Sequence, residues 1–190
     1  MQESLLPLLR CPVTRGALTV SILKKRTKIF NTESSEIIDE AVLYASEGWF
    51  YPVIKGIPRL NVEAFLDHEQ FLRLAVSNYD VLKENLLQKY GGLVSYAVKK
   101  NKRTKASFTK EWSVYDYDKD NTWDAGDDAM AARFLKETGE TEQSLGGKLI
   151  FDAGCGNGKL ETLIASNCGL IIAMDFANCI EEAYDRNNYS

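Results

Sequence analysis

Two carboxylates and a group of glycines near the C-terminal end of the chain have the residue types and spacing of a nucleotide site. Asp152 precedes a turn that contains Gly154, Gly156 and Gly158, and Asp175 follows Gly154 by 21 residues. Glycine tolerates positive φ and lets a ligand approach the backbone closely. A turn that opens onto a helix N-terminus also presents N–H groups with partial positive charge. Because an acid at the tip of the next strand can bind a ribose diol, the pattern predicts a ribose-containing cofactor.

The flanking segments predict a strand, turn, helix and strand that would position these residues. The apolar runs 149–151 and 170–174 lack polar alternation, as fully buried parallel strands do, and residues 159–165 have a helical pattern. We therefore expect an α/β fold with the start of a doubly wound Rossmann-like sheet. The alternative is a glycine turn that only connects two buried strands, although such a turn does not require the paired acids.

The glycine spacing discriminates between cofactors. The dinucleotide pattern is G-x-G-x-x-G, and Lys159 stands where its third glycine would be, which argues against NAD and FAD. The string FDAGCGNG at 151–158 resembles motif I of the class I S-adenosylmethionine (SAM)-dependent methyltransferases. The resemblance covers about residues 108–190 and includes the downstream acid.

This resemblance implies roles for individual residues. Gly154, Gly156 and Gly158 would line the methionine and ribose parts of SAM, and Asp175 would bind the ribose hydroxyls. Asp152 would orient the turn or meet the methionine ammonium. The complete set of predicted cofactor-binding residues is Asp152, Gly154, Cys155, Gly156, Asn157, Gly158, Asp175 and Phe176, the last near the adenine. No catalytic residue can be assigned.

Residues 1–61 predict a small β-rich module. The expected elements are a short apolar helix from Leu5, strands at 18–23, 41–44 and 49–53, and a polar loop at 32–35. Pro52 and Pro58 favour an extended segment outside the centre of a sheet.

The module resembles the Trm112 family of methyltransferase activators in LLRCP at 8–12, GAL at 16–18 and YPVIKGIP at 51–58. That family often has a C-P-x-C pair and a second cysteine pair. Here Thr14 replaces the second cysteine of the first pair, and 44–50 contains no cysteine. A closed zinc site needs four ligands, so we predict a module without zinc or any other metal.

Residues 62–107 predict a helical linker region, with one helix over 79–90 that Gly91 and Gly92 end. The basic cluster 99–110 is either a solvated face or a phosphate contact. The aromatic residues from Phe108 to Trp123 either pack under a loop or cover a cofactor. Asp127 is expected to cap a helix over 128–138, and a last helix is expected over 176–189.

Composition limits the class of protein. The 190 residues carry a net charge of −4 with a pI of about 5.2, which gives no global attraction for nucleic acid. No apolar run approaches the roughly 20 residues of a membrane span, and the first 20 residues lack a signal sequence, so we expect a cytoplasmic protein without membrane contact. The four cysteines lack paired spacing and are interpreted as reduced thiols.

Together these patterns predict the N-terminal portion (108–190) of a SAM-dependent methyltransferase domain behind the module. Two parallel strands cannot cover both faces of a doubly wound sheet, so we expect a chain that continues into a longer enzyme and is incomplete by itself. The expected acceptor is a small molecule or a glycan. RNA as acceptor and a non-catalytic adaptor role are the alternatives, and the oligomeric state stays open.

Overall fold

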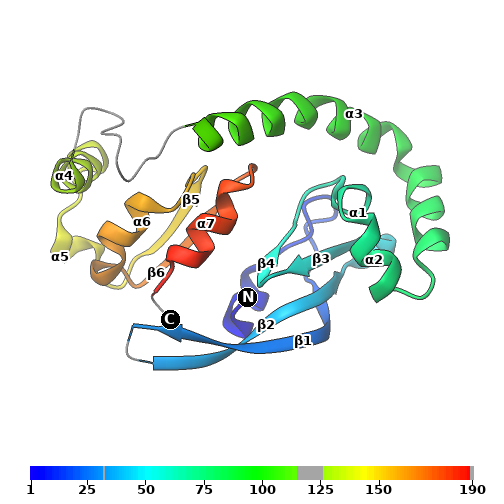
Figure 1. Cartoon of the computed structure of the whole chain (residues 1–190), viewed down its shortest axis with the longest axis horizontal. Helices are drawn as coiled ribbons and strands as arrows, with labels where there is room; N and C mark the ends of the chain where they lie inside the picture. The colour runs from blue at the N-terminus through cyan, green and yellow to red at the C-terminus, as the bar shows by residue number, and fades with distance from the viewer. Residues whose placement is uncertain (32, 115–125, 189–190) are drawn as a thin grey trace. The chain divides into compact units, whose positions relative to one another are not determined.

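The structure is a computed structural model that describes residues 1–31, 33–114 and 126–188, except for the side chains of residues 112 and 113. The chain divides into two compact units, Met1–Asn101 and Lys102–Ser190. The first contains an antiparallel sheet of four strands and the second a parallel sheet of two, so the fold is mixed α/β (Figure 1). None of the helices in the described ranges is both long and apolar enough to cross a membrane.

The first unit begins with a 3₁₀ helix and continues into its sheet. Its elements are η1 (Glu3–Leu8), β1 (Thr19–Phe30), β2 (Glu33–Tyr44), η2 (Ser46–Gly48), β3 (Phe50–Ile54) and β4 (Ile57–Pro58). The sheet order is β1-β2-β3-β4, and every neighbouring pair is antiparallel.

The polar segment 32–35, which was predicted to be a loop, instead leads into a long hairpin. β1 and β2 pair out to Phe30↔Glu33, so strand β2 begins within the predicted loop. Ion pairs across the ribbon support it, such as Lys25 Nζ and Glu36 Oε1 at 2.8 Å, and cross-strand pairs of this kind contribute about 0.2–1 kcal/mol each. Most of β1 is exposed, so the hairpin needs no apolar alternation and gives no such signal in the sequence.

Pro52 lies in an inner strand, contrary to the prediction from the sequence. β3 pairs with β2 through Val42↔Pro52 and with β4 on its other side. The Pro52 carbonyl accepts a hydrogen bond from the Arg59 N–H at 2.9 Å. Since the N–H and C=O positions of one strand residue point to the same side, the missing Pro52 N–H also faces away from β2 and leaves that ladder intact. Pro58 lies on the short edge strand β4, where proline is tolerated.

One apolar core joins this sheet to the helices that follow it. The helices are α1 (Ala64–Asp67), α2 (Glu69–Ala75) and α3 (Tyr79–Val114), the last of which continues into the second unit. The Phe50 ring lies 6.0 Å from the rings of both Phe65 and Tyr79. The Tyr79 hydroxyl donates to the Phe65 carbonyl at 2.7 Å. Residues of the predicted helical linker region up to Val94 therefore share the core of the predicted module.

Helix α3 does not end at Gly91 and Gly92, as the sequence predicted, but continues to Val114. The only irregularity within it is a kink at Tyr90, whose φ and ψ are −126° and 16°. A glycine that ends a helix adopts the left-handed conformation, and neither Gly91 nor Gly92 does so. The helix therefore tolerates both at about 1 kcal/mol each relative to alanine, while Val94 beyond them is buried.

The second unit has the strand, helix and strand that the sequence predicted. Its elements are α4 (Asp127–Thr138), α5 (Glu142–Leu145), β5 (Leu149–Ala153), α6 (Lys159–Ile164), η4 (Ala165–Asn167), β6 (Leu170–Met174) and α7 (Cys179–Arg186). β5 and β6 are parallel neighbours, in register from Leu149↔Leu170 to Ala153↔Met174. Gly139 ends α4 in the left-handed conformation, as predicted, but Gly126 rather than Asp127 is its N-cap. Helix α7 is shorter than the predicted 176–189.

The two parallel strands are not fully buried, in contrast to the prediction. Alternate residues of β5, Leu149 and Phe151, are 61% and 62% exposed, and Leu170 and Met174 of β6 are 44% and 45% exposed. Because successive side chains of a strand point to opposite faces, these residues leave one apolar face of the sheet open. The described residues thus contain two strands of a parallel sheet, and a doubly wound sheet stays a prediction.

Candidate functional site

The turn between β5 and α6 requires glycine at three positions. The φ angles of Gly154, Gly156 and Gly158 are +122°, +58° and +76°, a region that residues with a Cβ rarely adopt. Gly154 follows the last residue of β5, and Gly158 is the N-cap of α6. The backbone conformation of the turn therefore requires the three glycines of the sequence pattern.

The backbone amides of this turn bond within the protein, which corrects the prediction that they face a ligand. The N–H groups of Gly154 and Cys155 both donate to the Met174 carbonyl, at 2.8 and 3.0 Å. The Gly158 N–H donates to the Cys155 carbonyl at 3.0 Å. A site for phosphate needs several N–H groups directed at the anion, so this turn is poorly suited to a pyrophosphate.

Asp175 lies against the turn, immediately after the end of β6. Its Oδ2 accepts a hydrogen bond from the Gly156 N–H at 2.9 Å, and its Oδ1 accepts one from the Ala177 N–H at 2.7 Å. A carboxylate offers about four acceptor positions, so both oxygens keep capacity for further donors such as hydroxyl groups. The structure thus brings together Asp175 and Gly156, which lie 19 residues apart in the sequence.

The turn is open at its start and closed at its end. Apart from its chain neighbours, none of the described residues has an atom within 4 Å of the position that a Cβ on Gly154 would take. A Cβ on Gly158 would lie 2.9 Å from the Ala183 Cβ and 3.0 Å from the Ala183 Cα of helix α7. Asn157 is buried, with 3% exposure, and its Oδ1 accepts a hydrogen bond from the Lys159 N–H at 3.3 Å. A ligand can therefore approach Gly154, whereas Gly158 serves the packing of α7.

Three carboxylates surround Cys155 in the middle of the turn. Burial, followed by the carboxylates of Glu161, Asp175 and Asp152, raises the pKa of the Cys155 thiol far above its usual range. Asp152 is the next-to-last residue of β5, and Glu161 is the third residue of α6. The site therefore has a strongly negative electrostatic potential, and a thiolate at Cys155 is disfavoured.

Glu161 is the most perturbed acid of this group. Both of its carboxylate oxygens expose less than 1 Å², and neither has a hydrogen-bond donor among the described residues. Burial, then the neighbouring Asp152, raise the pKa of Glu161 to about 8. Two ionised carboxylates have no proton to share, whereas a protonated Glu161 can donate to Asp152, so the protonated form is the favoured one at neutral pH.

Phe176, the predicted neighbour of adenine, lies beside Asp175 and is half-buried. The Nζ of Lys105 lies 5.0 Å from the centre of its ring. Of the predicted aromatic cluster, Phe108 is 47% exposed, so it does not pack in the core. The Trp112 side chain lies outside the described part of the chain, as do residues 115–125, which contain Tyr115, Tyr117 and Trp123.

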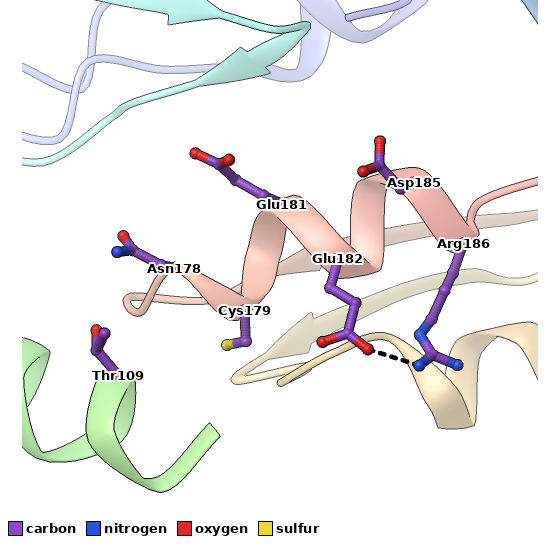
Figure 2. A pocket seen from close by; sticks show the side chains of 7 residues that line it. All are labelled: Thr109, Asn178, Cys179, Glu181, Glu182, Asp185 and Arg186. Atoms are coloured by element: carbon purple, nitrogen blue, oxygen red, sulfur yellow. Dashed lines mark hydrogen bonds and ion pairs between the residues drawn. The ribbon is translucent and has the colours of Figure 1, made fainter. Parts of the chain in front are cut away.

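A groove of about 680 Å³ lies along helix α7, where Thr109 faces it from α3 (Figure 2). Acidic side chains predominate, and Glu182 pairs with Arg186 at 2.6 Å. None of the eight predicted cofactor-binding residues lines this groove. Cys179 connects the two regions, because it lines the groove while Asp175, second to burial, raises the pKa of its thiol to about 12.

No metal centre is present among the residues that the structure describes, since no three His, Cys, Asp or Glu side chains gather in a suitable group. Cys11, the remaining cysteine of the predicted zinc-less module, is 1% exposed and its Sγ lies 3.1 Å from the Tyr51 hydroxyl. The Thr14 N–H donates to the same sulfur at 3.3 Å. Cys11 thus has hydrogen-bond partners within the core.

The sequence analysis missed two residues of this site, Glu161 and Ala183. Glu161 had a usable signal, because an acid in the first turn of a helix can fold back toward the residues before it. Ala183 had none, since its contact with Gly158 joins positions 25 residues apart.

Comparisons with known proteins add no family assignment. No protein-family model matches the chain, and a search of curated proteins also gives no match. The resemblances to methyltransferases and to the Trm112 family therefore stay predictions.

Proposed function

We propose that residues 108–190 form part of a SAM-dependent methyltransferase domain that transfers a methyl group to a small molecule or a glycan. The observation that carries this proposal is the combination of an internally bonded glycine turn with carboxylates around it. Asp152, Glu161 and Asp175 all act on Cys155 at the centre of that turn. Such a site favours a ligand that carries positive charge and ribose hydroxyls.

Charge distinguishes SAM from the other nucleotide cofactors. SAM carries a positively charged sulfonium and a positively charged ammonium on its methionine part, whereas NAD and FAD carry a pyrophosphate. Opposite charges a few ångströms apart attract by several kcal/mol in a partly buried site, and like charges repel similarly. The occupied N–H groups of Gly154, Cys155 and Gly158 also leave few donors for phosphate oxygens.

The residues present fit SAM in three respects. The remaining acceptor capacity of Asp175 suits the ribose diol. The open space at Gly154 admits the ligand next to the backbone. Asp152 supplies the negative charge that an ammonium group requires, and Glu161 is a second acid beside it. When bound, SAM supplies an electrophilic methyl group, and the contribution of this chain is to hold and orient it.

RNA is a second candidate acceptor, because helix α3 carries an exposed basic cluster. Lys99, Lys100, Lys102 and Arg103 are all exposed. Clusters of this kind bind phosphates with strong salt dependence. The net charge of −4 opposes nucleic-acid binding, so a small molecule or a glycan is preferred. The other alternative is a non-catalytic adaptor, which would not bind the cofactor.

Isothermal titration calorimetry with SAM, its demethylated product and NAD tests the proposal. We expect SAM to bind, the demethylated product to bind more weakly for lack of the sulfonium charge, and NAD not to bind. Gly154→Leu should weaken SAM binding by tenfold or more, which corresponds to about 1.4 kcal/mol, because its side chain would enter the open space. Gly139→Leu is the control for the backbone effect, since Gly139 also has a positive φ (+70°, against +122° at Gly154) and lies outside the turn, and no other described residue beyond its chain neighbours has an atom within 4 Å of its Cβ position.

A folded protein that binds neither SAM nor its product would exclude the cofactor assignment and favour the adaptor role. Equal loss of binding in Gly154→Leu and Gly139→Leu would show that strain, and not blockage of the turn, causes the effect.

A further inference from the structure

The carboxyl group of Glu161 is buried in an arrangement that two ionised acids cannot satisfy. Each of its oxygens exposes less than 1 Å² and has no donor among the described residues. Asp152 is the charged group that acts on the Glu161 carboxyl group. When Asp152 is ionised, it can only accept hydrogen bonds and cannot donate one to Glu161. A buried unpaired charge is expensive, and one proton between the two groups would turn an unfavourable contact into a hydrogen bond.

Cations of α4, α6 and α7 form ion pairs with other acids within the described part of the chain. Lys159 of α6 forms an ion pair with Asp127 of α4 at 2.9 Å. The arginines of α4 and α7 pair on their own helices, through Arg133–Glu137 at 2.7 Å and Arg186–Glu182 at 2.6 Å. From the turn, the Cys155 thiol lies within the electrostatic influence of both members of the pair, and of Asp175 at the end of β6. The remaining titratable groups on α4 and α7 are Asp128, Lys136, Cys179, Glu181, Tyr184 and Asp185.

We propose that Glu161 and Asp152 share one proton in the ligand-free chain and release it to solvent when a cationic group of the ligand enters the site. This inference rests on the proposed function, since the ammonium and sulfonium of SAM are the cations considered. The proton leaves the Glu161 carboxyl group and passes to buffer, and the positive charge of the ligand beside Asp152 then balances the two carboxylates. Glu161 is thus a specificity residue for positive charge, placed one helical turn beyond the glycines.

The structure fixes the sign of the resulting pH dependence. Burial and Asp152 raise the pKa of Glu161 to about 8, so the proton is present at pH 7 and must leave when the ligand binds. Affinity should therefore increase with pH by up to about tenfold per unit below pH 8 and level off above it. A site that does not exchange this proton would show no such increase.

Calorimetric titration with SAM at pH 7.0 in buffers of different ionisation enthalpy measures the proton directly. We expect release of close to one proton by the native chain and of none by Glu161→Gln, which keeps the shape and cannot ionise. Glu161→Gln should bind SAM with the same affinity at pH 6.5 and pH 8.5, whereas the native affinity should be about 25-fold higher at pH 8.5 than at pH 6.5. Glu137→Gln on α4 is the matched control and should behave like the native chain.

A second measurement separates this inference from the cofactor assignment. Carbon-13 NMR of the ligand-free chain reports the titration of the Glu161 carboxyl group, and we expect a midpoint near pH 8. SAM binding without proton release, or a Glu161 midpoint near that of an ordinary glutamate, would overturn the shared proton while the cofactor assignment stands. Absence of SAM binding together with a midpoint near pH 8 would overturn the cofactor assignment and the release step, but not the shared proton.

Discussion

Substitution of Gly158 by alanine gives the most quantitative test of how the turn is built. The new Cβ would lie 2.9 Å from the Ala183 Cβ and 3.0 Å from its Cα, so helix α7 must move. Overpacking of this kind costs about 1–3 kcal/mol. A non-glycine residue at a φ of +76° adds about 1–2 kcal/mol of strain. We expect Gly158→Ala to lower the free energy of unfolding by about 2–5 kcal/mol.

Gly139→Ala isolates the strain part of this effect. Its φ of +70° nearly equals that of Gly158, and no atom lies within 4 Å of its Cβ position. Urea unfolding should show a loss of only about 1–2 kcal/mol for Gly139→Ala. The difference between the two variants then measures packing against α7. In a double-mutant cycle, Ala183→Gly should recover part of the Gly158→Ala loss, because it removes the nearer contact. Equal losses for Gly158→Ala and Gly139→Ala, or no coupling to Ala183→Gly, would refute the packing argument.

Three further outcomes are expected. Gly92→Ala should raise the free energy of unfolding by about 0.5–1 kcal/mol, as measured by urea unfolding, because Gly92 is helical with no atom within 4 Å of its Cβ position; a loss would contradict the continuous helix. Burial lowers the pKa of the Met1 α-amine to about 5, so the unfolded chain binds more protons and stability should rise between pH 5 and pH 8, by the order of 1–2 kcal/mol after solvent screening. Urea unfolding at pH 5.5 and 7.5 measures this change. It is carried out in the Glu161→Gln variant, because native Glu161 makes the free energy of unfolding fall with pH over the same range. A free energy of unfolding that does not change with pH would show that the Met1 amine titrates normally. Tyr51→Phe should cost about 1 kcal/mol in the same assay, because it removes the buried contact between its hydroxyl and Cys11 Sγ, and a neutral result would contradict that contribution.

Local patterns in the sequence predicted the elements of the second unit whose conformation depends on neighbouring residues. The β5–α6–β6 unit follows from two apolar runs on either side of a glycine turn, and Gly139 ends α4 because a left-handed residue is needed there. The strands predicted at 18–23 and 41–44 are the inner ends of β1 and β2. The outer part of this hairpin was missed because it gains stability from cross-strand ion pairs such as Lys25–Glu36 and not from a buried face. Continuation of α3 past Gly91 was missed because tertiary packing of Val94 outweighs an unfavourable helix propensity.

The spacing in the sequence predicted that Asp175 meets the glycine turn but did not predict the hydrogen bonds there. Asp175 does reach the turn, as its spacing suggested, but its first partner is the Gly156 N–H. The internal use of the turn's N–H groups depends on the position of Met174 on the neighbouring strand, which no local pattern contains. The role of Glu161 likewise depends on burial, since the same residue on an exposed helix would be an ordinary acid.

The most direct test of the central claim is a map of the SAM contact by amide chemical shifts of the ¹⁵N-labelled chain. We predict that SAM shifts the backbone amides of Gly154 and Gly156 and those following Asp175, saturates with a single affinity, and leaves the first unit unchanged. The absence of shifts in a folded chain, or shifts along the α7 groove without any at the glycine turn, would contradict the assignment.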